Sequence, residues 1–437
     1  MWSSIRKICL ILLKFKKNIK DLFLYNLGIH AFKLGIQLTS LFNPKARLWL
    51  EGRKNWQENL KNKVASLKLE NAIWFHCASL GEFEQGRPVI EKIKKENPSQ
   101  KIVLTFFSPS GYEIQKNYPF ADLVTYLPHD TTSNSKAFLS ILKPKLAIFV
   151  KYEFWLNYLF ELDKKNTPAF LISTVIKKHQ TFFKWYGSNF RNALKTYKTV
   201  YTQDVHSIKL LRVLKVGTGV LAGDTRFDRV LQICSSPKKI NEIEDFAKNS
   251  FVIVAGSSWQ KDEDYLIESY VQLKEKYPHL KLIIAPHEID KKNIDRLKNL
   301  LYKNQLPFHL FSDNPPAYTD SILVVNAIGF LSSIYQYGTV AFIGGGFNSG
   351  IHNILEPTVY GLPVIFGPNY KKFNEAFEVI DLNAGFVVND AAELTKQLNT
   401  LIEDEKALSE SSRLAKNYVL KNSGATNKIV DGLKEFL

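Results

Sequence analysis

Two successive series of short apolar segments, each alternating with amphipathic stretches, constrain the fold of this chain most. They predict strands at 72–77, 102–107, 146–150, 169–173 and 199–201, and again at 251–255, 280–285, 322–325, 340–343 and 364–366. Strands that alternate with helices form parallel sheets covered by helices. We therefore predict an α/β protein of two doubly wound domains that face a central cleft at the carboxyl ends of their strands.

The length of the chain agrees with two domains, because 437 residues exceed what one hydrophobic core usually supports. The first series ends between residues 223 and 230, and residues 238–250 lead into the second. We predict an N-terminal segment at 1–42, a first domain at 43–235 and a second domain at 236–437.

The charge of the chain is strongly positive, with 58 Lys and Arg against 42 Asp and Glu and a net charge of +16. Such a charge indicates an anionic partner, which is a nucleic acid, a membrane surface or a phosphorylated substrate. The first 20 residues contain no acid and six basic residues, Arg6, Lys7, Lys14, Lys16, Lys17 and Lys20.

The apolar stretch that follows, residues 22–42, is long enough to span a bilayer but contains His30 and Lys33. Basic residues beside apolar helical segments suit a helix that lies in an anionic leaflet. The alternative is an ordinary amphipathic helix packed on the first domain. We predict membrane association of this N-terminal helix.

The glycine-rich stretch 339–369 reads as strand, glycine loop and helix. Glycines let a ligand approach the backbone, and the free N–H groups at a helix start favour an anion. Glu356, in the first turn of the helix, suits the two hydroxyls of a ribose. With Gly345, Gly346 and Asn353, the stretch predicts a nucleotide site, although the glycines alone fit a tight turn equally well.

In the first half, polar residues follow the ends of predicted strands. Ser79 and Glu82 follow strand 72–77, where they form either a capping box or a cleft-facing base. Glu153 follows strand 146–150 at the same sheet edge, as a second carboxylate. Ser108 and Gly111 lie in a turn that either contacts an anion or hydroxyl or is simply a turn.

In the second half, several small-residue turns end neighbouring strands and together predict one binding surface. Ser257 either holds a phosphate or caps a helix, and His287 either contacts a base or phosphate or is incidental. A further turn at 326–331 contains Gly329 and Leu331. The three cysteines, Cys9, Cys77 and Cys234, form neither a disulfide framework nor a metal-ligand spacing, which fits a reducing compartment.

The sequence resembles the 3-deoxy-D-manno-octulosonic acid (Kdo) transferases of lipopolysaccharide biosynthesis, a glycosyltransferase family of the GT-B fold with two Rossmann-like domains. The resemblance covers nearly the whole chain, and its motifs occur in the order of the family. They are an ArgLeuTrp…GlyArg stretch (47–53), WFHCASLGE (74–82), TFFSPSG (105–111), YLPHD (126–130), KYEFWLN (151–157), AGDTRFDR (222–229) and GGGFNSGIHNILEP (344–357).

This resemblance implies an inverting transfer of Kdo from CMP-Kdo to a lipid A precursor of the lipid IVA type, without a cofactor or metal. It also implies attachment through the N-terminus to the cytoplasmic face of the inner membrane, whose surface is anionic, and no nucleic-acid partner. Glu82 matches the proposed general base of the family, and Glu153 matches a second glutamate near the acceptor, with Ser79, Ser108 and Gly111 on the acceptor side. The residues matched to CMP binding are Asn353, Glu356, Gly329 and Leu331.

The sequence departs from the family at two places. Many members have Pro-Arg-His after a strand of the donor domain, where this chain has Ala285-Pro286-His287, so that an arginine contact to CMP is lost or supplied elsewhere. The glycine loop before His352 is shorter than in some members. Two alternatives remain, a GT-B transferase or epimerase that uses a UDP-sugar, and a non-catalytic basic protein that binds membranes or nucleic acid.

Overall fold

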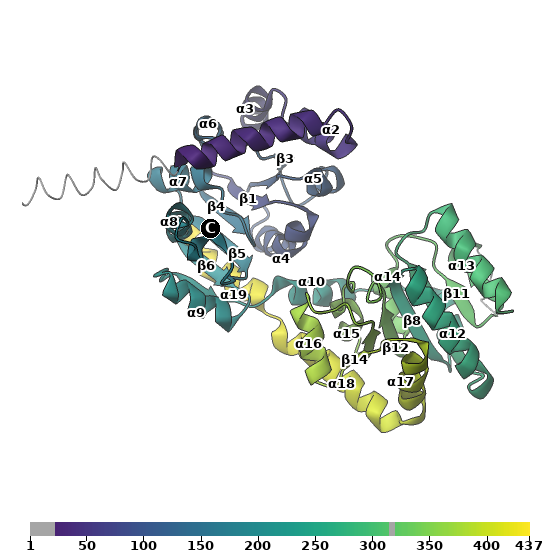
Figure 1. Cartoon of the computed structure of the whole chain (residues 1–437). Coiled ribbons are helices and arrows are strands. Elements are labelled where there is room, and N and C mark those ends of the chain that lie inside the picture. The colour runs from purple at the N-terminus through teal and green to yellow at the C-terminus, as the bar shows by residue number, and fades with distance from the viewer. Residues whose placement is uncertain (1–21, 314–319) are drawn as a thin grey trace, which may run out of the picture. The chain divides into compact units, whose positions relative to one another are not determined.

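The structure is a computed structural model that describes residues 22–313 and 320–437. The six basic residues among the first 20 of the chain lie outside these ranges. The chain forms two compact units (Figure 1). Unit 1 runs to Arg229 and includes Gly424–Leu437, and unit 2 is Val230–Ser423.

Unit 1 contains a sheet of seven parallel strands in the order β3-β2-β1-β4-β5-β6-β7. The five predicted strands are confirmed, whereas β3 and β7 at the two edges were not predicted. The strands are β1 (Ile73–Cys77), β2 (Ile102–Phe106), β3 (Leu123–Tyr126), β4 (Leu146–Val150), β5 (Ala169–Thr174), β6 (Thr199–Thr202) and β7 (Gly219–Leu221).

Helices cover both faces of this sheet, as the alternation predicted, and bury it so fully that no residue of β1 is exposed. Gly86 of α4 packs against the sheet, because a Cβ atom there would lie 2.9 Å from Val150. The helices are α2 (Pro44–Glu51), α3 (Trp56–Leu67), α4 (Leu80–Glu96), α5 (Pro109–Gln115), α6 (Thr132–Leu142), α7 (Leu156–Lys164), α8 (Ser188–Thr196), α9 (Val205–Val213) and α10 (Thr225–Cys234).

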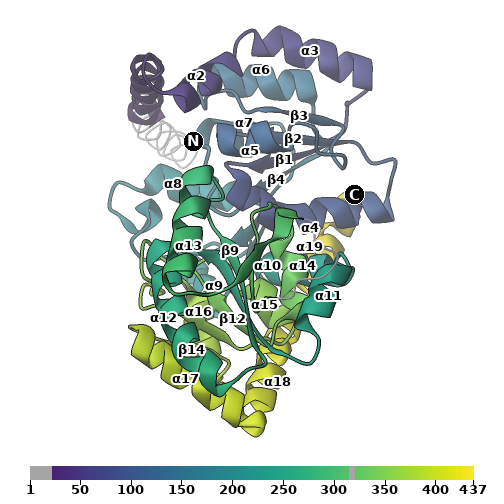
Figure 2. The same ribbon diagram turned by 90° about the vertical axis from the view of Figure 1, so that its right-hand side faces the viewer.

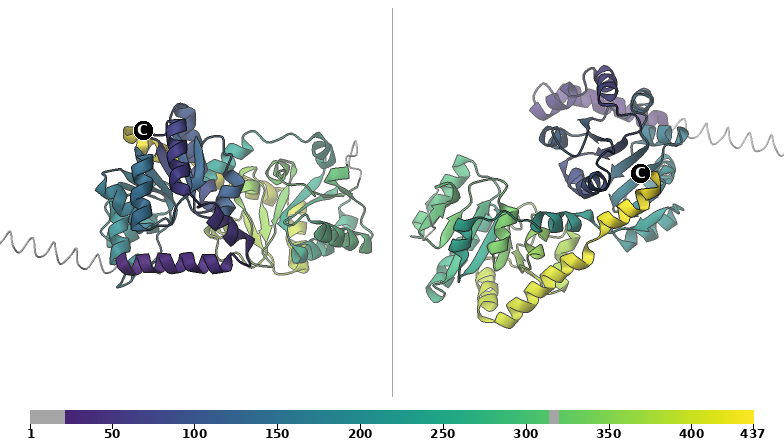
Figure 3. Two further views of the ribbon diagram at one scale, coloured as in Figure 1. Left: turned by 90° about the horizontal axis from the view of Figure 1, so that it is seen from above. Right: turned by 180° about the vertical axis from the view of Figure 1, so that it is seen from behind.

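A further helix, residues 22–39, precedes these elements and runs along one side of unit 1 (Figure 3). It is attached by partly buried polar contacts, since the Tyr25 hydroxyl donates to Asp130 at 2.6 Å and Asn157 Nδ2 donates to Asn26 Oδ1 at 2.9 Å. Among residues 22–313 and 320–437, no helix has the length and apolar character needed to cross a membrane.

Unit 2 contains a second sheet of seven parallel strands, in the order β10-β11-β9-β8-β12-β13-β14. The five predicted strands are again confirmed, and again two short edge strands, β10 and β14, were not predicted. The strands are β8 (Phe251–Ser258), β9 (Leu280–Pro286), β10 (Phe308–Leu310), β11 (Ile322–Val324), β12 (Val340–Ile343), β13 (Val364–Phe366) and β14 (Gly385–Val387).

The helices of unit 2 lie on both sides of its strands, with α12 and α13 on one side and α11 and α14 on the other (Figure 2). Both units are therefore Rossmann-like α/β domains. The helices are α11 (Asn241–Ala247), α12 (Gln260–Lys276), α13 (Lys291–Lys303), α14 (Leu331–Ile334), α15 (Leu355–Val359), α16 (Asn374–Asp381), α17 (Ala391–Glu403) and α18 (Glu405–Asn422).

The last helix, α19 (Ala425–Leu433), belongs to unit 1, although we had assigned the chain end to the second domain. Its apolar side is fully buried in the core of unit 1 through Ile429, Val430 and Leu433. The backbone N–H groups of Gly424 and Thr426 each donate to the Asp228 carboxylate at 2.6 Å. The hydrophobic pattern of α19 predicts a helix but does not say which sheet it covers.

Candidate functional site

The predicted residues of the first half meet at one edge of the unit 1 sheet. β1 pairs in parallel with β2 on one side and with β4 on the other. The segments that carry Glu82, Ser108 and Glu153 follow the carboxyl ends of these three strands. The prediction that both carboxylates leave the same edge is therefore confirmed.

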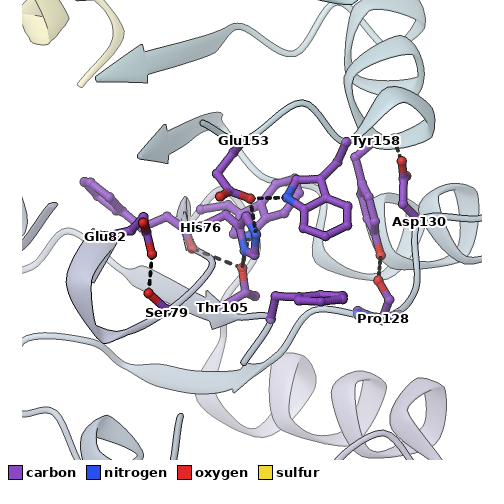
Figure 4. A network of polar contacts seen from close by, with 12 residues as sticks. His76, Ser79, Glu82, Thr105, Pro128, Asp130, Glu153 and Tyr158 are labelled. Atoms are coloured by element: carbon purple, nitrogen blue, oxygen red, sulfur yellow. Dashed lines mark hydrogen bonds and ion pairs between the residues drawn. The ribbon is translucent and has the colours of Figure 1, made fainter. Parts of the chain in front are cut away.

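Glu82 lies half-buried in the first turn of α4, and the Ser79 hydroxyl donates to its Oε2 atom (Figure 4). Within the described chain, Ser79 forms no capping hydrogen bond through its side chain. The capping-box alternative is therefore not realised. The contact with Ser79 orients a carboxylate that remains partly accessible to solvent.

Glu153 is held much more tightly than Glu82. Its side chain is 7% exposed, and its Oε2 atom lies 3.2 Å from His76 Nε2. The Trp155 indole N–H donates to the same oxygen (Figure 4). These contacts fix the orientation of the Glu153 carboxylate.

His76, which contacts Glu153, was not among the site residues predicted from the sequence. It lies fully buried in β1, and its Nδ1 atom is 2.9 Å from Thr105 Oγ1, which also accepts from Trp74 Nε1 at 2.8 Å. The single proton of the Thr105 hydroxyl has two acceptors within reach, His76 Nδ1 and, at 3.2 Å, the Phe75 carbonyl oxygen, and the tautomer of His76 determines which of them it meets. A polar residue in an otherwise apolar strand was the available signal, because a buried polar group needs a partner.

Two predicted residues on this edge have local structural roles. Ser108 caps α5, since its Oγ atom accepts from Ser110 N at 3.2 Å. Gly111 lies against the ring of Phe106, where a Cβ atom would come within 2.3 Å of Cδ1. The contacts of these two residues therefore explain their identity without a ligand.

In unit 2, the glycine loop follows β12, next to β8, and packs closely on neighbouring backbone. A Cβ atom on Gly344 would lie 2.1 Å from Ser257 O, and one on Gly346 would lie 2.4 Å from Gly367 N. Gly345 has a φ of +87°, a conformation that glycine adopts without strain. Backbone packing therefore explains these three glycines.

The Asp262 carboxylate pairs with backbone N–H groups of the glycine loop and of the turn after β8. It accepts from Gly345 N at 2.7 Å and from Trp259 N at 2.8 Å, and it also bonds the backbone of Phe347. Burial raises the pKa of Asp262, and these hydrogen bonds oppose the rise. The Gly345 N–H is thus already paired, and its hydrogen bond to Asp262 holds the glycine loop in place.

Three aromatic rings stack beside the glycine loop. The ring centres of Trp259 and His287 are 4.7 Å apart, and those of His287 and His352 are 4.4 Å apart. The Trp259 indole N–H donates to His352 Nε2 at 3.0 Å. Burial and the neighbouring His287 lower the pKa of His352, so that its ring is neutral at pH 7. Trp259 and His352 were not among the predicted site residues.

Asn353 and Glu356 lie together, as the sequence suggested. Asn353 Nδ2 donates to Glu356 Oε1 at 3.0 Å, and Asn353 Oδ1 accepts from Leu355 N at 3.0 Å. The helix that follows, α15, has only five residues. Its dipole is correspondingly small, which weakens the predicted helix-start contribution to anion binding.

A cavity of about 320 Å³ opens beside Trp259, with Ser258, Pro286, Phe347 and Asn348 among its lining residues. Within the described part of unit 2, Lys261 is the one cation in this lining. The other predicted donor residues lie elsewhere. Ser257 has a φ of +54°, Gly329 is exposed with a φ of +88°, and Leu331 begins α14.

No metal cluster accompanies these sites in the part of the chain that the structure describes. No three His, Cys, Asp or Glu side chains are grouped there so as to hold a metal ion.

Comparisons with known proteins identify relatives of the whole chain. Residues 54–229 match the family described as 3-deoxy-D-manno-octulosonic-acid transferase (kdotransferase), and residues 237–418 match glycosyl transferases group 1. The 3-deoxy-D-manno-octulosonic acid transferase of Aquifex aeolicus is 30% identical over 84% of this chain and 94% of its own length. That of Haemophilus influenzae is 26% identical over 92% and 94%, respectively.

The fold of the chain is also similar to that of solved structures. UDP-GlcNAc 2-epimerase from Neisseria meningitidis, crystallised with UDP-GlcNAc, superposes with a TM-score of 0.59 and 15% identity. The match covers 83% of this chain and all of that one, and it shows a shared two-domain fold.

Proposed function

The chain belongs to the 3-deoxy-D-manno-octulosonic acid (Kdo) transferase family, and from this premise we propose that it transfers Kdo from CMP-Kdo to a lipid A precursor of the lipid IVA type. Transfer of Kdo in lipopolysaccharide biosynthesis is the activity of this glycosyltransferase, which has the GT-B type of fold.

The observation that supports the mechanism is the contrast between the two carboxylates of unit 1. Glu82 is half-buried and accepts a hydrogen bond from Ser79, whereas Glu153 is buried between His76 and Trp155. A general base must reach the hydroxyl proton that it removes. We therefore assign the base to Glu82 and the orientation of the acceptor to Glu153.

The reaction then proceeds as one displacement. The acceptor hydroxyl transfers its proton to Glu82 as its oxygen attacks the anomeric carbon of Kdo, opposite the phosphate. The bond between this carbon and the phosphate oxygen breaks, CMP leaves with the electron pair, and the configuration at the carbon inverts. A positioned base contributes about 10²–10⁴-fold to such a step.

Unit 2 supplies the donor site in this proposal. Glu356, held by Asn353, contacts the ribose, and the stacked rings of Trp259, His287 and His352 border the nucleotide. Lys261 supplies the positive charge that the missing arginine would have carried. Ser257, Gly329 and Leu331 complete the proposed donor site through backbone contacts, and Gly345 and Gly346 contribute through the shape of their loop.

The N-terminal helix is proposed to attach the enzyme to the anionic cytoplasmic face of the inner membrane. Leu24, Leu27, Leu34, Leu38 and Leu41 are each more than half exposed and recur at helical spacing. We call these five residues the leucine stripe. A basic protein with an exposed apolar stripe suits an anionic lipid surface, which also presents the lipid acceptor.

The test is incubation of the purified protein with CMP-Kdo and a tetra-acylated lipid A precursor, with the products resolved by mass. We expect a mass increase of one or more Kdo units, which depends on CMP-Kdo and fails with UDP-sugars. Transfer from a UDP-sugar, or none from CMP-Kdo, would overturn the proposal.

A further inference from the structure

A second cavity, of about 260 Å³, lies in unit 1 outside the residues assigned above to the chemical step. Its lining consists of Ile29, Phe32, Phe107, His129, Asp130 and Trp155. Four of these six side chains are aliphatic or aromatic, namely those of Ile29, Phe32, Phe107 and Trp155. These four residues come from three separate segments of the chain.

The two polar residues of the lining are already satisfied or neutral. Asp130 is buried, and its carboxylate accepts from the Tyr25 hydroxyl, Asn157 N and Tyr158 N. Burial, together with the nearby basic side chains of Arg53, Lys33 and His30, lowers the pKa of His129 to about 4, so that this imidazole is neutral at pH 7. An apolar ligand therefore meets no unpaired charge in the lining.

Arg53 holds this cavity in shape. Its buried guanidinium donates to the carbonyl oxygens of Leu127 at 2.8 Å, Trp49 at 2.9 Å and Phe107 at 2.7 Å. It also stacks 4.1 Å from the centre of the Trp49 ring. The family-like stretch 47–53 thus fixes the loops after β2 and β3, which makes the cavity a preformed feature.

One wall of the cavity belongs to the N-terminal helix. Phe32 stacks on Phe107 with ring centres 6.1 Å apart and meets Trp49 at 5.8 Å. Four residues of the leucine stripe lie on this same helix, with Leu41 in the turn that follows, and Tyr25 and Asn26 fasten the helix to unit 1. The helix therefore carries both a lipid-facing stripe and part of the cavity wall.

The cavity also lies next to the candidate catalytic edge. Trp155 lines it and donates its indole N–H to Glu153 Oε2, and Phe107 packs on Trp155 with ring centres 4.7 Å apart. A ligand in the cavity is thus separated from the Glu153 carboxylate by one side chain.

We propose that this cavity is an acyl-chain subsite, which takes one hydrocarbon chain of the lipid acceptor. The inference rests on the proposed function for the identity of the acceptor. Its support is the lining without an unpaired charge, the continuity of its wall with the helix of the leucine stripe, and the nearby Lys33 cation, which suits the phosphates of such a lipid.

The test fills the cavity without altering the catalytic residues. Ile29→Trp adds a large ring to the lining, whereas Gln37→Trp makes the corresponding change at an exposed position of the same helix that belongs neither to the lining nor to the leucine stripe. KM is measured for a tetra-acylated and a fully deacylated lipid A precursor. Displacement of about two methylenes costs about tenfold in KM.

We expect Ile29→Trp to raise KM for the acylated acceptor by about tenfold, and to leave KM for the deacylated acceptor and for CMP-Kdo unchanged. Gln37→Trp should leave all three values unchanged. An equal rise for both acceptors, or an equal effect of the two substitutions, would overturn the subsite.

A binding measurement separates this inference from the proposed function. A fluorescent long-chain fatty acid should bind the wild-type protein and the Gln37→Trp variant, and bind Ile29→Trp at least about tenfold more weakly. Equal binding by all three proteins refutes the subsite even if Kdo is transferred. Selective loss in Ile29→Trp supports it even if the wild type transfers no Kdo.

Discussion

Glu82 and Glu153 leave the same edge of one sheet but have different surroundings, and this difference determines what each can do. The Glu153 carboxylate is buried, and its Oε2 atom contacts both His76 and Trp155, whereas Glu82 contacts a serine and faces partly outward. Proton transfer requires the second kind of environment, because the base must form a hydrogen bond with the substrate.

Glu82→Gln should lower the turnover number by about 10²–10⁴-fold, because glutamine cannot take the proton of the acceptor hydroxyl. CMP binding, measured by titration calorimetry, should be unchanged because the variant residue lies in unit 1. Glu84→Gln is the matched control on the same helix, where Glu84 pairs with Arg87 and Arg229. Wild-type turnover in Glu82→Gln would remove this residue from the base role.

The buried Asp130 makes stability depend on pH. Burial raises the pKa of Asp130 from 3.8 to about 6, against the hydrogen bonds from Tyr25, Asn157 and Tyr158. As pH rises from about 4 to about 6, the unfolded chain releases this proton first, so stability decreases. The difference between the pKa values of the unfolded and folded states corresponds to about 3 kcal/mol of unfolding free energy.

Asp130→Asn should therefore remove this part of the pH dependence. The free energy of unfolding of the wild type, relative to the variant, should fall by about 3 kcal/mol between about pH 4 and pH 6 and then level off. Urea unfolding at a series of pH values measures the difference. Parallel profiles for the two proteins would contradict the assignment.

Single residues at strand ends could be predicted from the sequence, whereas their buried partners could not. Glu82 and Glu153 follow recognisable strands. His76 is paired with Thr105, 29 residues along the chain, and with Glu153, which is further still. Such pairs depend on strand order and register, and a local sequence pattern contains neither.

At the scale of elements, the glycine loop depends on a helix that precedes it by some eighty residues. Asp262, in the first turn of α12, pairs with the N–H groups of Gly345 and Trp259. A buried donor left without a partner costs about 1–3 kcal/mol. The conformation of the loop therefore depends on this carboxylate.

Asp262→Ala should weaken CMP binding by at least about tenfold, because the loop loses the acceptor that orders it. Asp264→Ala, at an exposed position that pairs with Arg296, is the matched control. Calorimetry with CMP gives the dissociation constants, and circular dichroism melting shows whether the fold persists. A folded Asp262→Ala variant with wild-type affinity would refute this role.

The four strands that were missed, β3, β7, β10 and β14, lie at the sheet edges. β7, β10 and β14 have three residues each and are partly exposed, and β3 has four residues. β11 and β13 are as short but fully buried, so that their residues form apolar runs that the sequence shows. The helix predicted after the glycine loop is α15.

At the scale of the whole molecule, the chain end returns to the unit in which the chain begins. α19 buries Ile429 completely beside residues of β1, so its removal affects unit 1. Ile429→Ala should lower the stability of unit 1 by about 2–5 kcal/mol. The exposed Asn427→Ala should change it by less than about 0.5 kcal/mol.

Hydrogen exchange shows where the Ile429→Ala effect falls. Faster exchange is expected in β1 and α4 of unit 1, whereas the strands of unit 2 should keep their protection. If protection were lost only in unit 2, the assignment of α19 to unit 1 would be wrong.

The net charge of +16 and the leucine stripe together predict how the enzyme meets its lipid substrate. Binding to anionic vesicles should weaken as salt is added, because screening removes the electrostatic attraction, and neutral phosphatidylcholine vesicles should bind weakly throughout. Leu38→Asp should lower vesicle binding by at least about tenfold, since it removes buried apolar area and adds an anion. Gln37→Asp makes a comparable change in charge at the neighbouring exposed residue and should reduce binding much less.

Vesicle co-sedimentation measures the binding of both variants. Equal losses would show that charge alone, without insertion of the leucine stripe, attaches the protein.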